Sequence, residues 1–441
     1  MVYDRIKNVF KEIKTPDMKN IARITSTKFT RNRKMNYEDF MLILLARRGT
    51  TTTMELNNFF TEQDRRDDIV SKQAFSKQRC NLNPDVFIAL NNNYVERIYQ
   101  DEEIIKHKGY IITAIDESAI EIPNTEGLQE AYKCKHSGKF EHRTIARALA
   151  SGIYDIENNV MIDSKINSKK GGERSLATEN IFNMPNIIRN TDKIITIFDR
   201  GYISVEMLLM LLDTPIKYLF RLPTTTFKKE QQSMKSNDEI VEIILTTGRL
   251  SNIDEPIIKQ RGKDLKTLKV RIVKITLNTG EVEFLLTNLF DEKEFSTKEI
   301  GELYYKRWGI EQAFDVIKNK LNIENISGRK RLIVEQDFYA QMLVFDMAED
   351  LRRDANNKLE PSKKSDLKYD YKVNMNVLVG TFREYMIKIL IEEDEEKSEK
   401  MYTYMMDEMI RSLVPIRPGR NNPRKAYSGV NKHRTNLRRN S

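Results

Sequence analysis

The chain is 441 residues long, with 39% hydrophobic and 32% charged residues and a net charge of +9. This composition predicts a soluble, globular protein of two to four domains. The longest uninterrupted apolar runs, at residues 41–46 and 207–212, are far too short to span a membrane. The first residues contain no apolar signal core. The composition therefore argues against a membrane-spanning protein.

The cysteine and histidine residues limit which disulfides and metal sites the chain can form. Cys80 and Cys134 stand alone without a CxxC pair, which favours a reducing cytoplasm and argues against a disulfide scaffold or a thiolate zinc site. The four histidines are scattered, although His136 and His142 could share a site. A metal ion is therefore expected on carboxylates, which suit Mg²⁺ or Mn²⁺.

The positive charge is concentrated in residues 414–441. This segment holds eight basic residues and no acidic ones, so the rest of the chain carries a net charge near +1 (9 minus 8). Such a basic tail favours a polyanionic partner, nucleic acid before membrane, because no amphipathic apolar stretch accompanies it. A solvated terminus without a partner is the alternative, and the tail alone does not decide between them.

Residues 1–105 are predicted to form a helical domain. Short amphipathic segments with Ser, Thr or Asn-Pro punctuation lie at residues 37–48, 53–60, 71–79 and 84–100. The third segment, SKQAFSKQR, contains Lys72, Lys77 and Arg79. These residues favour a DNA-binding domain with a reader of the helix-turn-helix kind. An ordinary helical packing domain is the alternative.

Residues 106–220 have a different residue pattern from the helical segments before them and are predicted to form the first part of an α/β core. The stretches YIITAID (110–116) and KIITIFD (193–199) are apolar runs that end in Asp, which is typical of buried strands. Two more strands around the Asn158-Asn159 turn, and then a helix at 173–182, are expected between them. This alternation of strands and helices predicts the α/β class.

The second half of the chain is predicted to contain four further segments. Residues 221–296 are rich in Val, Ile, Thr and Leu with Gly-bearing turns, which predicts a β-rich insertion. Residues 297–353 are expected to complete the core and to open with a single helix over about 297–322. C-terminal helices follow over 354–413, and the basic tail covers 414–441.

The expected helix at 297–322 carries two separate stripes. At about 100° per residue, four polar or charged residues fall within an arc of about 60°; they are Tyr304, Arg307, Glu311 and Lys318. The apolar residues gather about 120° away; they are Ile310, Ala313, Ile317 and Leu321. The helix therefore has one stripe for a core and one for chemistry.

Three acids stand out by position: Asp116 and Asp199 at the ends of buried strands, and Glu311 on the polar stripe. A buried acid is costly unless it is paired, hydrogen-bonded or metal-bound. Either Asp alone is more simply a turn or helix-cap residue. Supplied by two strands and a helix, however, the three acids can converge and hold two divalent cations about 4 Å apart, as phosphodiester chemistry requires.

Several stretches resemble one protein family. The spacing Y-(2)-R-(3)-E-(6)-K at Tyr304, Arg307, Glu311 and Lys318, together with IFDRGY at 197–202, is similar to bacterial insertion-sequence transposases of the DDE class, in the group typified by insertion sequence four. AIDESAIEIPN, ISGRKRLIVEQDFYA and SKQAFSKQR are also similar to family sequences, so the resemblance covers most of residues 35–350. Glu117 departs from the Gly that family members commonly carry, and on a strand its side chain should point away from that of Asp116.

The resemblance implies a ribonuclease-H-like catalytic core with the β-rich insertion between the second Asp and the Glu. It assigns Asp116, Asp199 and Glu311 to catalysis and to binding two Mg²⁺ (or Mn²⁺) ions. It also implies that Tyr304, Arg307 and Lys318 contact DNA phosphates at the transposon end. The implied protein is a homodimer on paired ends in the bacterial cytoplasm, at the nucleoid.

The implied function is a metal-dependent transposase that cuts transposon ends and joins the 3′-hydroxyl to target DNA. The alternatives are a nuclease of the same fold, or a catalytically inactive DNA-binding protein derived from a transposase. Trp308, the only tryptophan, could stack on an unpaired base, although a place at the rim of the core is the simpler interpretation.

Overall fold

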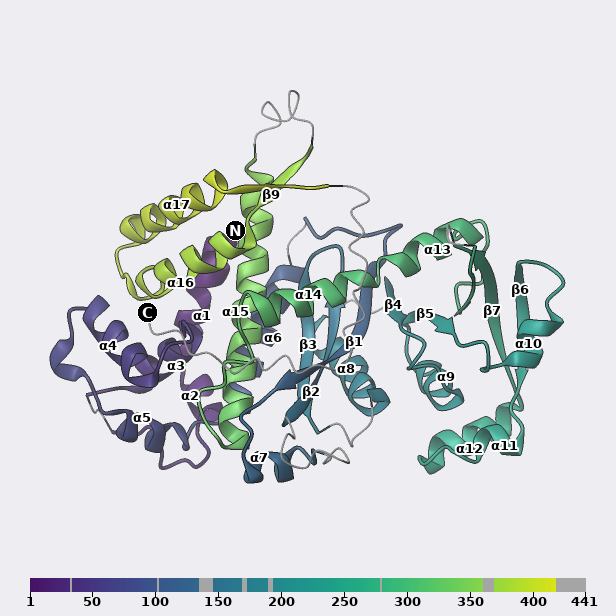
Figure 1. Cartoon of the computed structure of the whole chain (residues 1–441), viewed down its shortest axis with the longest axis horizontal. Coiled ribbons are helices and arrows are strands. Elements are labelled where there is room, and N and C mark those ends of the chain that lie inside the picture. The colour runs from purple at the N-terminus through teal and green to yellow at the C-terminus, as the bar shows by residue number, and fades with distance from the viewer. Residues whose placement is uncertain are drawn as a thin grey trace, which may run out of the picture. The chain divides into compact units, whose positions relative to one another are not determined.

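The computed structural model describes residues 1–31, 34–100, 103–134, 146–168, 173–188, 193–277, 280–359 and 369–417 (Figure 1). The chain divides into two compact units. A helical unit comprises Met1–Arg97, Ile120–Arg147 and Asp315–Ser441, and a sheet unit comprises Ile98–Ala119 and Ala148–Phe314. None of the helices in the described ranges combines the length and the apolar character needed to cross a membrane.

An eight-stranded mixed sheet forms the sheet unit, with strand order β3-β2-β1-β4-β5-β8-β7-β6. The strands are β1 (Ile111–Glu121), β2 (Arg147–Asp155), β3 (Val160–Asn167), β4 (Ile194–Phe198), β5 (Lys217–Leu222), β6 (Asp238–Ile244), β7 (Thr267–Thr276) and β8 (Val282–Thr287). Parallel pairing joins β1 to β4 and β4 to β5. Antiparallel pairing joins β2 to β3, and β5, β8, β7 and β6 in succession. The strand-rich insertion therefore extends the sheet at one edge.

Helices connect these strands, so the α/β class predicted from the sequence is confirmed as a mixed sheet with many helices. The helices of this unit are α8 (Glu173–Ile187), α9 (Val205–Leu211), α10 (Lys228–Ser233), α11 (Thr247–Leu250), α12 (Pro256–Leu265) and α13 (Thr297–Tyr305), and the first part of α14 (Trp308–Asn319). A capping box of Ser296 and Glu299 begins α13. All five residues of β4, IITIF, are buried, as expected of a central strand made of β-branched and aromatic residues.

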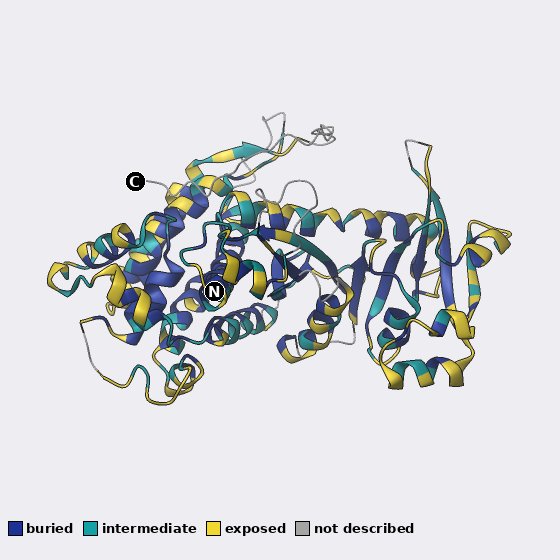
Figure 2. Cartoon of the chain, turned by 60° about the horizontal axis from the view of Figure 1, so that its bottom comes forward, coloured by how far each residue is buried: buried dark blue, intermediate teal, exposed yellow. Residues whose placement is uncertain are grey.

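Helices also build the helical unit, around the long helix α15 (Arg331–Asn357). The others are α1 (Val2–Ile13), α2 (Pro16–Ile21), α3 (Tyr37–Leu45), α4 (Thr52–Glu62), α5 (Lys72–Arg79), α6 (Asp85–Tyr99), α7 (Glu126–Ala131), α16 (Met375–Ile391) and α17 (Glu395–Arg411), with a 3₁₀ turn at Arg66–Asp68 and a short ribbon of β9 (Tyr371–Val373) and β10 (Leu413–Pro415). Helix α15 packs against α1, α3, α16 and α17. Figure 2 shows the buried residues gathered along these helices and in the strands of the sheet.

A buried ion pair fixes α1 on α15. Arg5 donates from Nε and Nη2 to the two carboxylate oxygens of Asp350, both at 2.8 Å, and the Tyr94 hydroxyl donates to the same carboxylate at 2.9 Å. A bidentate pair of this kind adds geometric specificity to an otherwise apolar core.

A buried carboxylate likewise fixes α8 on the sheet. Asn180 of α8 donates to Asp163 of β3 at 3.0 Å and accepts a hydrogen bond from Ser151 of β2 at 2.8 Å. Lys165 lies 3.5 Å from Asp163. Burial raises the pKa of Asp163 to about 6, although Lys165 and Asn180 oppose the shift.

Asp163→Asn should change how stability depends on pH. Because the folded pKa lies above the usual value, the protonated carboxyl stabilises the fold fully below about pH 4, and this contribution is lost as pH rises through 6. From pH 4 to pH 7 the free energy of unfolding should therefore shift by about 2–3 kcal/mol in favour of the variant. Urea unfolding at several pH values measures this difference.

The exposed Asp254 provides a matched control, since Asp254→Asn should show no such trend. A difference between Asp163→Asn and wild type that stays flat with pH would contradict the assignment.

Candidate active site

Asp116, in the middle of β1, and Asp199, directly after β4, are neighbours across two adjacent strands. The prediction that a strand ends at Asp116 is wrong, because β1 continues to Glu121. The parallel strands β1 and β4 pair Ile115 with Phe198, and each Asp is the next residue along the chain. Adjacent strands lie about 4.8 Å apart, and residues at the same level of a parallel pair share a face. The sheet register therefore brings the two carboxylates side by side.

The tyrosine, arginine and glutamate of the Y-R-E-K pattern are divided between two helices. Tyr304 belongs to α13 and Glu311 to α14, while Arg307 lies in the turn between them. The prediction of a single helix over 297–322 is therefore wrong. At the junction Lys306 N donates to Leu303 O (3.0 Å) and Arg307 N to Tyr304 O (3.1 Å), the three-residue spacing of a 3₁₀ turn. The side chains of Lys306 and Arg307 make long-range ion pairs here, and helical periodicity alone cannot predict them.

Tyr304 and Arg307 contact all three acids. Arg307 Nη2 donates to Glu311 Oε1 at 2.8 Å, and Arg307 Nη1 lies 3.6 Å from Asp116 Oδ2. The Tyr304 hydroxyl donates to Asp199 Oδ1 at 3.4 Å. The structure therefore gathers Asp116, Asp199 and Glu311, which are far apart in the sequence, around one guanidinium and one phenol.

The electrostatics of the group follow from this proximity. Burial is the main cause that raises the pKa of Asp116 to about 6, and the charges of Glu311 and Asp199 contribute in the same direction. The amide of Glu117, which donates to Asp116 at 2.8 Å, and the Arg307 guanidinium oppose this shift. The protonation of Asp116 therefore depends first on its burial and then on the charges around it.

The pKa values of Arg307 and Tyr304 are also raised. Burial would lower the pKa of Arg307, but Tyr304, Asp199 and Glu311 together hold it above its usual value. Burial raises the pKa of Tyr304, so its hydroxyl stays protonated and available as a donor. Arg307 is thus a permanent cation among the acids, with only 9% of its side chain exposed.

Carboxylate oxygens are the donors that Mg²⁺ and Mn²⁺ prefer, so the three acids fit such an ion in their chemistry. As the side chains stand, however, no three His, Cys, Asp or Glu residues in the described ranges are grouped closely enough to hold one ion. Arg307 pairs with Glu311 and Asp116 instead. Metal binding by the three acids therefore requires Glu311 to leave Arg307.

The other predicted residues of α14 are placed differently. Trp308 is 44% exposed, and the Arg307 guanidinium lies 5.2 Å from its ring centroid, within the range of a cation–π contact. Lys318 is half-buried in the last turn of α14 and belongs to the helical unit.

Helix α5 presents its basic residues in two ways. Ser71 caps the helix by accepting from Ala74 N, and Lys72 and Lys77 are exposed. Arg79 is only 3% exposed, which does not favour the DNA contact predicted for it. Arg79 lies four residues after the buried Phe75, on the face of α5 that turns into the unit.

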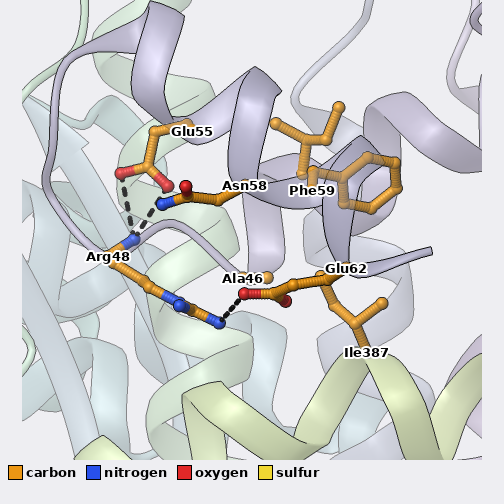
Figure 3. A pocket seen from close by; sticks show the side chains of 8 residues that line it. Ala46, Arg48, Glu55, Asn58, Phe59, Glu62 and Ile387 are labelled. Atoms are coloured by element: carbon orange, nitrogen blue, oxygen red, sulfur yellow. Dashed lines mark hydrogen bonds and ion pairs between the residues drawn. The ribbon is translucent and has the colours of Figure 1, made fainter. Parts of the chain in front are cut away.

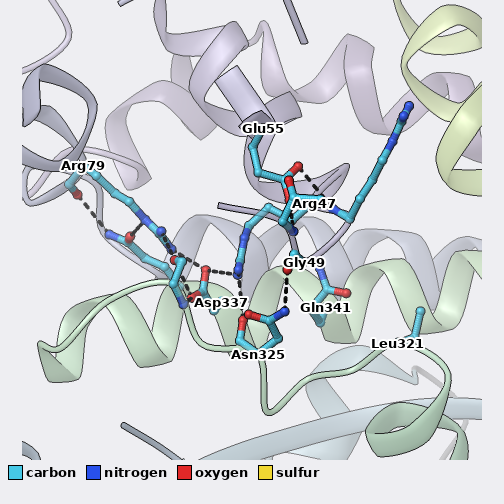
Figure 4. A network of polar contacts seen from close by, with 12 residues as sticks. Arg47, Gly49, Glu55, Arg79, Leu321, Asn325, Asp337 and Gln341 are labelled. Atoms are coloured by element: carbon cyan, nitrogen blue, oxygen red, sulfur yellow. Dashed lines mark hydrogen bonds and ion pairs between the residues drawn. The ribbon is translucent and has the colours of Figure 1, made fainter. Parts of the chain in front are cut away.

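A buried network holds Arg79 (Figure 4). Its guanidinium donates to Asp337 at 2.5 Å, to Gln336 at 2.7 Å and to Ser327. Asp337 also pairs with Arg47 at 2.8 Å. Burial alone would raise the pKa of Asp337, but the two guanidinium groups hold it below its usual value. Arg79 therefore fixes α5 against α15.

The same network places basic residues beside α5 that the sequence interpretation missed. Arg329 and Lys330 follow Ser327 and are exposed, and Lys330 Nζ lies 3.6 Å from Cys80 Sγ at the end of α5. The basic run GRKR was the available signal, but its proximity to α5 depends on the Arg79–Asp337 contact.

A small pocket in the helical unit lies between α3, α4 and Ile387 of α16 (Figure 3). Arg48 and Glu62 pair there at 2.8 Å, and the Arg48 amide donates to Glu55 at 3.1 Å. None of the residues predicted to be functional lines this pocket.

Residues 107–347 match the family described as the transposase DDE domain. This match covers more than half of the chain, and the chain belongs to that family. It is also similar to the transposase InsG for insertion sequence element IS4 of Escherichia coli (strain K12), with 22% identity over 199 residues, 44% of this chain and 41% of that protein. The resemblance to insertion-sequence DDE transposases is thus confirmed, although the match spans less than half of that relative.

A solved structure, the cryo-EM structure of the piggyBac transposase synaptic complex with hairpin DNA, is also similar. It is 10% identical, with a TM-score of 0.44 over 95% of this chain and 84% of that chain. This likeness is too low to carry an argument about the present chain.

Arg79→Ala should lower the free energy of unfolding by about 3 kcal/mol, because it removes one partner of a buried ion pair. Lys77→Ala, two residues earlier on the exposed side of the same helix, is the control and should change it by less than about 0.5 kcal/mol. Chemical denaturation measures both values. Equal, small losses would contradict the structural role of Arg79.

Proposed function

We propose that this protein is a DNA transposase, which cuts DNA at the ends of a transposable element and joins the freed 3′-hydroxyl to target DNA. The observation that carries the proposal is the convergence of the acids. Asp116, within β1, and Asp199, directly after β4, each follow the paired residues Ile115 and Phe198 of these parallel strands, and Arg307 joins Glu311 to Asp116. Membership of the transposase DDE domain family supports the same activity.

The fold supports a ribonuclease-H-like core. The strand order β3-β2-β1-β4-β5 combines an antiparallel β2–β3 hairpin with parallel β1, β4 and β5. Helix α8 lies between β3 and β4 in the chain. The β-rich insertion falls between Asp199 and Glu311, where the family resemblance predicts it.

In this proposal Asp116, Asp199 and Glu311 hold two Mg²⁺ or Mn²⁺ ions. When bound, such ions activate the attacking water or hydroxyl and stabilise the leaving oxygen. Arg307 would then exchange the Glu311 carboxylate for a phosphate oxygen of the DNA, an anion that a guanidinium binds equally well. Arg307 therefore keeps an anionic partner in both states.

The neighbouring aromatic residues have supporting roles in the proposal. The Tyr304 hydroxyl, which stays protonated, donates to Asp199 and can donate equally to a phosphate oxygen. Trp308 has an exposed ring beside Arg307, which supports stacking on an unpaired base at the cut. Lys318 is the third proposed phosphate contact of the Y-R-E-K pattern.

A basic stripe, defined as Lys72, Lys77 and Lys330, is the proposed DNA-backbone contact of the helical unit. Lys72, Ser76 and Cys80 recur every four residues and so lie along one side of α5, and Lys330 reaches Cys80 at its end. Lys77 is exposed about 100° around the helix from Ser76. From Lys72 to Cys80 the helix rises about 12 Å.

The remaining partner predictions rest on the family resemblance. The basic tail, beyond Arg417, lies outside the described residues and stays a prediction, as does the shared site of His136 and His142. A homodimer on paired ends and a place at the bacterial nucleoid are likewise proposals.

One observation favours the alternative of a catalytically inactive DNA-binding protein. The Arg307 guanidinium offsets part of the charge of the acids, and no three acids in the described part of the chain stand ready to bind an ion. Mg²⁺-dependent cleavage of transposon-end DNA separates the two functions. Cleavage without joining of pre-cut ends would instead favour a nuclease.

Asp116→Asn, Asp199→Asn and Glu311→Gln should each lower the rate of DNA cleavage at least about 1,000-fold, because each removes a charged ligand without changing shape. Binding of end DNA should stay within a few-fold of wild type. Glu302→Gln, on exposed α13 surface, is the control and should retain activity. Activity that survives in one of the three variants would remove that residue from the active site.

Lys77→Ala and Lys330→Ala should each lower the slope of log affinity against log salt by about 0.9, the value for one lost phosphate contact. The loss should be the same for any DNA sequence, because a backbone contact reads no bases. Fluorescence anisotropy at several salt concentrations measures the slope. Lys298→Ala, 85% exposed in the sheet unit, should leave it unchanged, and an unchanged slope in the two stripe variants would refute the contact.

A further inference from the structure

The turn between α13 and α14 contacts the tip of the β2–β3 hairpin at two points within the sheet unit. Lys306 in the turn forms an ion pair with Glu157 of the tip. Gly309, in the first turn of α14, lies against Ile156: a Cβ at position 309 would be only 2.8 Å from Ile156 Cγ2. Real Cβ atoms do not approach that closely, so only glycine permits this contact.

The hairpin tip is held from several sides. Asp155, which is fully buried, accepts from the amides of Glu157 (3.1 Å) and Asn158 (3.0 Å) and from the Tyr99 hydroxyl (2.8 Å). Ile156 N donates to Ile112 O of β1 at 3.0 Å. The tip therefore presents a fixed surface rather than a pliable loop.

A second contact lies farther along α14. A Cβ at Gly152 of β2 would be in ordinary van der Waals contact with Phe314 Cζ, at 3.6 Å, whereas the atom that it would approach too closely is Met161 Sδ of β3, at 2.5 Å. Phe314 is buried. Glu311 lies between Gly309 and Phe314 in the sequence, so strand β2 and the tip that follows it contact the helix on both sides of the acid.

The two halves of the active site are thus connected. Arg307 and Glu311 stand on either side of Gly309, and the hairpin tip is hydrogen-bonded to β1, the strand that carries Asp116. A displacement of about 1 Å at reacting groups can cost about 100-fold in rate. The distance between α14 and the hairpin tip therefore affects the position of Glu311 relative to Asp116.

We propose that Gly309 and Lys306, through Ile156 and Glu157, are positioning residues that set the place of Glu311 relative to Asp116. This inference rests on the proposed function, because it assigns a purpose to the same acids. None of these four residues belongs to the Y-R-E-K pattern or to the acidic triad.

Gly309→Ala tests the proposal. On helix propensity alone alanine is favoured, so harm must come from the contact with Ile156. The variant should lower the cleavage rate at saturating DNA about 10- to 100-fold and leave the DNA dissociation constant unchanged. Without DNA, its affinity for Mn²⁺, measured by calorimetry, should fall as well.

The double variant Gly309→Ala with Ile156→Ala should recover most of both losses, because it removes the Cγ2 methyl that the new Cβ meets. Gly248→Ala is the matched control and should behave as wild type, because this helical glycine of the same unit has no atom within 4 Å of the place that a Cβ would take. If Gly309→Ala folds poorly, Lys306→Glu and Glu157→Lys repeat the test: each single change should lower the rate, and the pair should restore it.

Retention of rate and Mn²⁺ affinity by Gly309→Ala, or failure of both double variants to recover, would overturn the proposal. A wild-type protein that binds Mn²⁺ but cleaves no DNA would refute the transposase activity alone. The positioning role would then still be decided by the Mn²⁺ affinities of the variants.

Discussion

Three carboxylates that approach one another repel, and the arrangement of the sheet unit depends on how this repulsion is offset. Burial is the main cause of the raised pKa of Asp116, and the charges of Glu311 and Asp199 act in the same direction. Arg307 offsets this repulsion by pairing with Glu311 and approaching Asp116. A group of acids held by one guanidinium is well suited to exchange that partner for metal ions and DNA phosphate.

Both units use a buried arginine with a carboxylate, but burial of the acids gives the two arginines different roles. Arg79 meets Asp337, which is only 1% exposed, and its donors are used within the helical unit. Arg307 meets Glu311 and Asp116, which keep 29% and 23% of their side chains exposed. The first pair is a fixed structural contact that aligns the basic stripe. The second faces acids that solvent, and by our proposal substrate, can still reach.

The differences between prediction and structure have one origin. The polar stripe of Tyr304, Arg307 and Glu311 was predicted from regular helical periodicity, yet the chain turns at Lys306 and Arg307, whose side chains pair with distant acids. Arg79 was predicted to contact DNA from its place on a basic segment, yet Asp337, 258 residues later, draws it inside. Helical periodicity and composition describe neighbours along the chain, whereas long-range ion pairs are decided by residues far away.

The sequence by itself determined the α/β class, the two buried strands that lead into Asp116 and Asp199, the Y-R-E-K spacing and the family, because these depend on residue order within short stretches. Only the tertiary structure decided that Ile115 pairs with Phe198, which sets the two aspartates side by side, and that Arg307 gathers the acids. It alone also brought Gly309 onto Ile156. Strand register and close packing bring together residues more than 80 positions apart in the sequence. Short sequence patterns do not predict contacts over such separations.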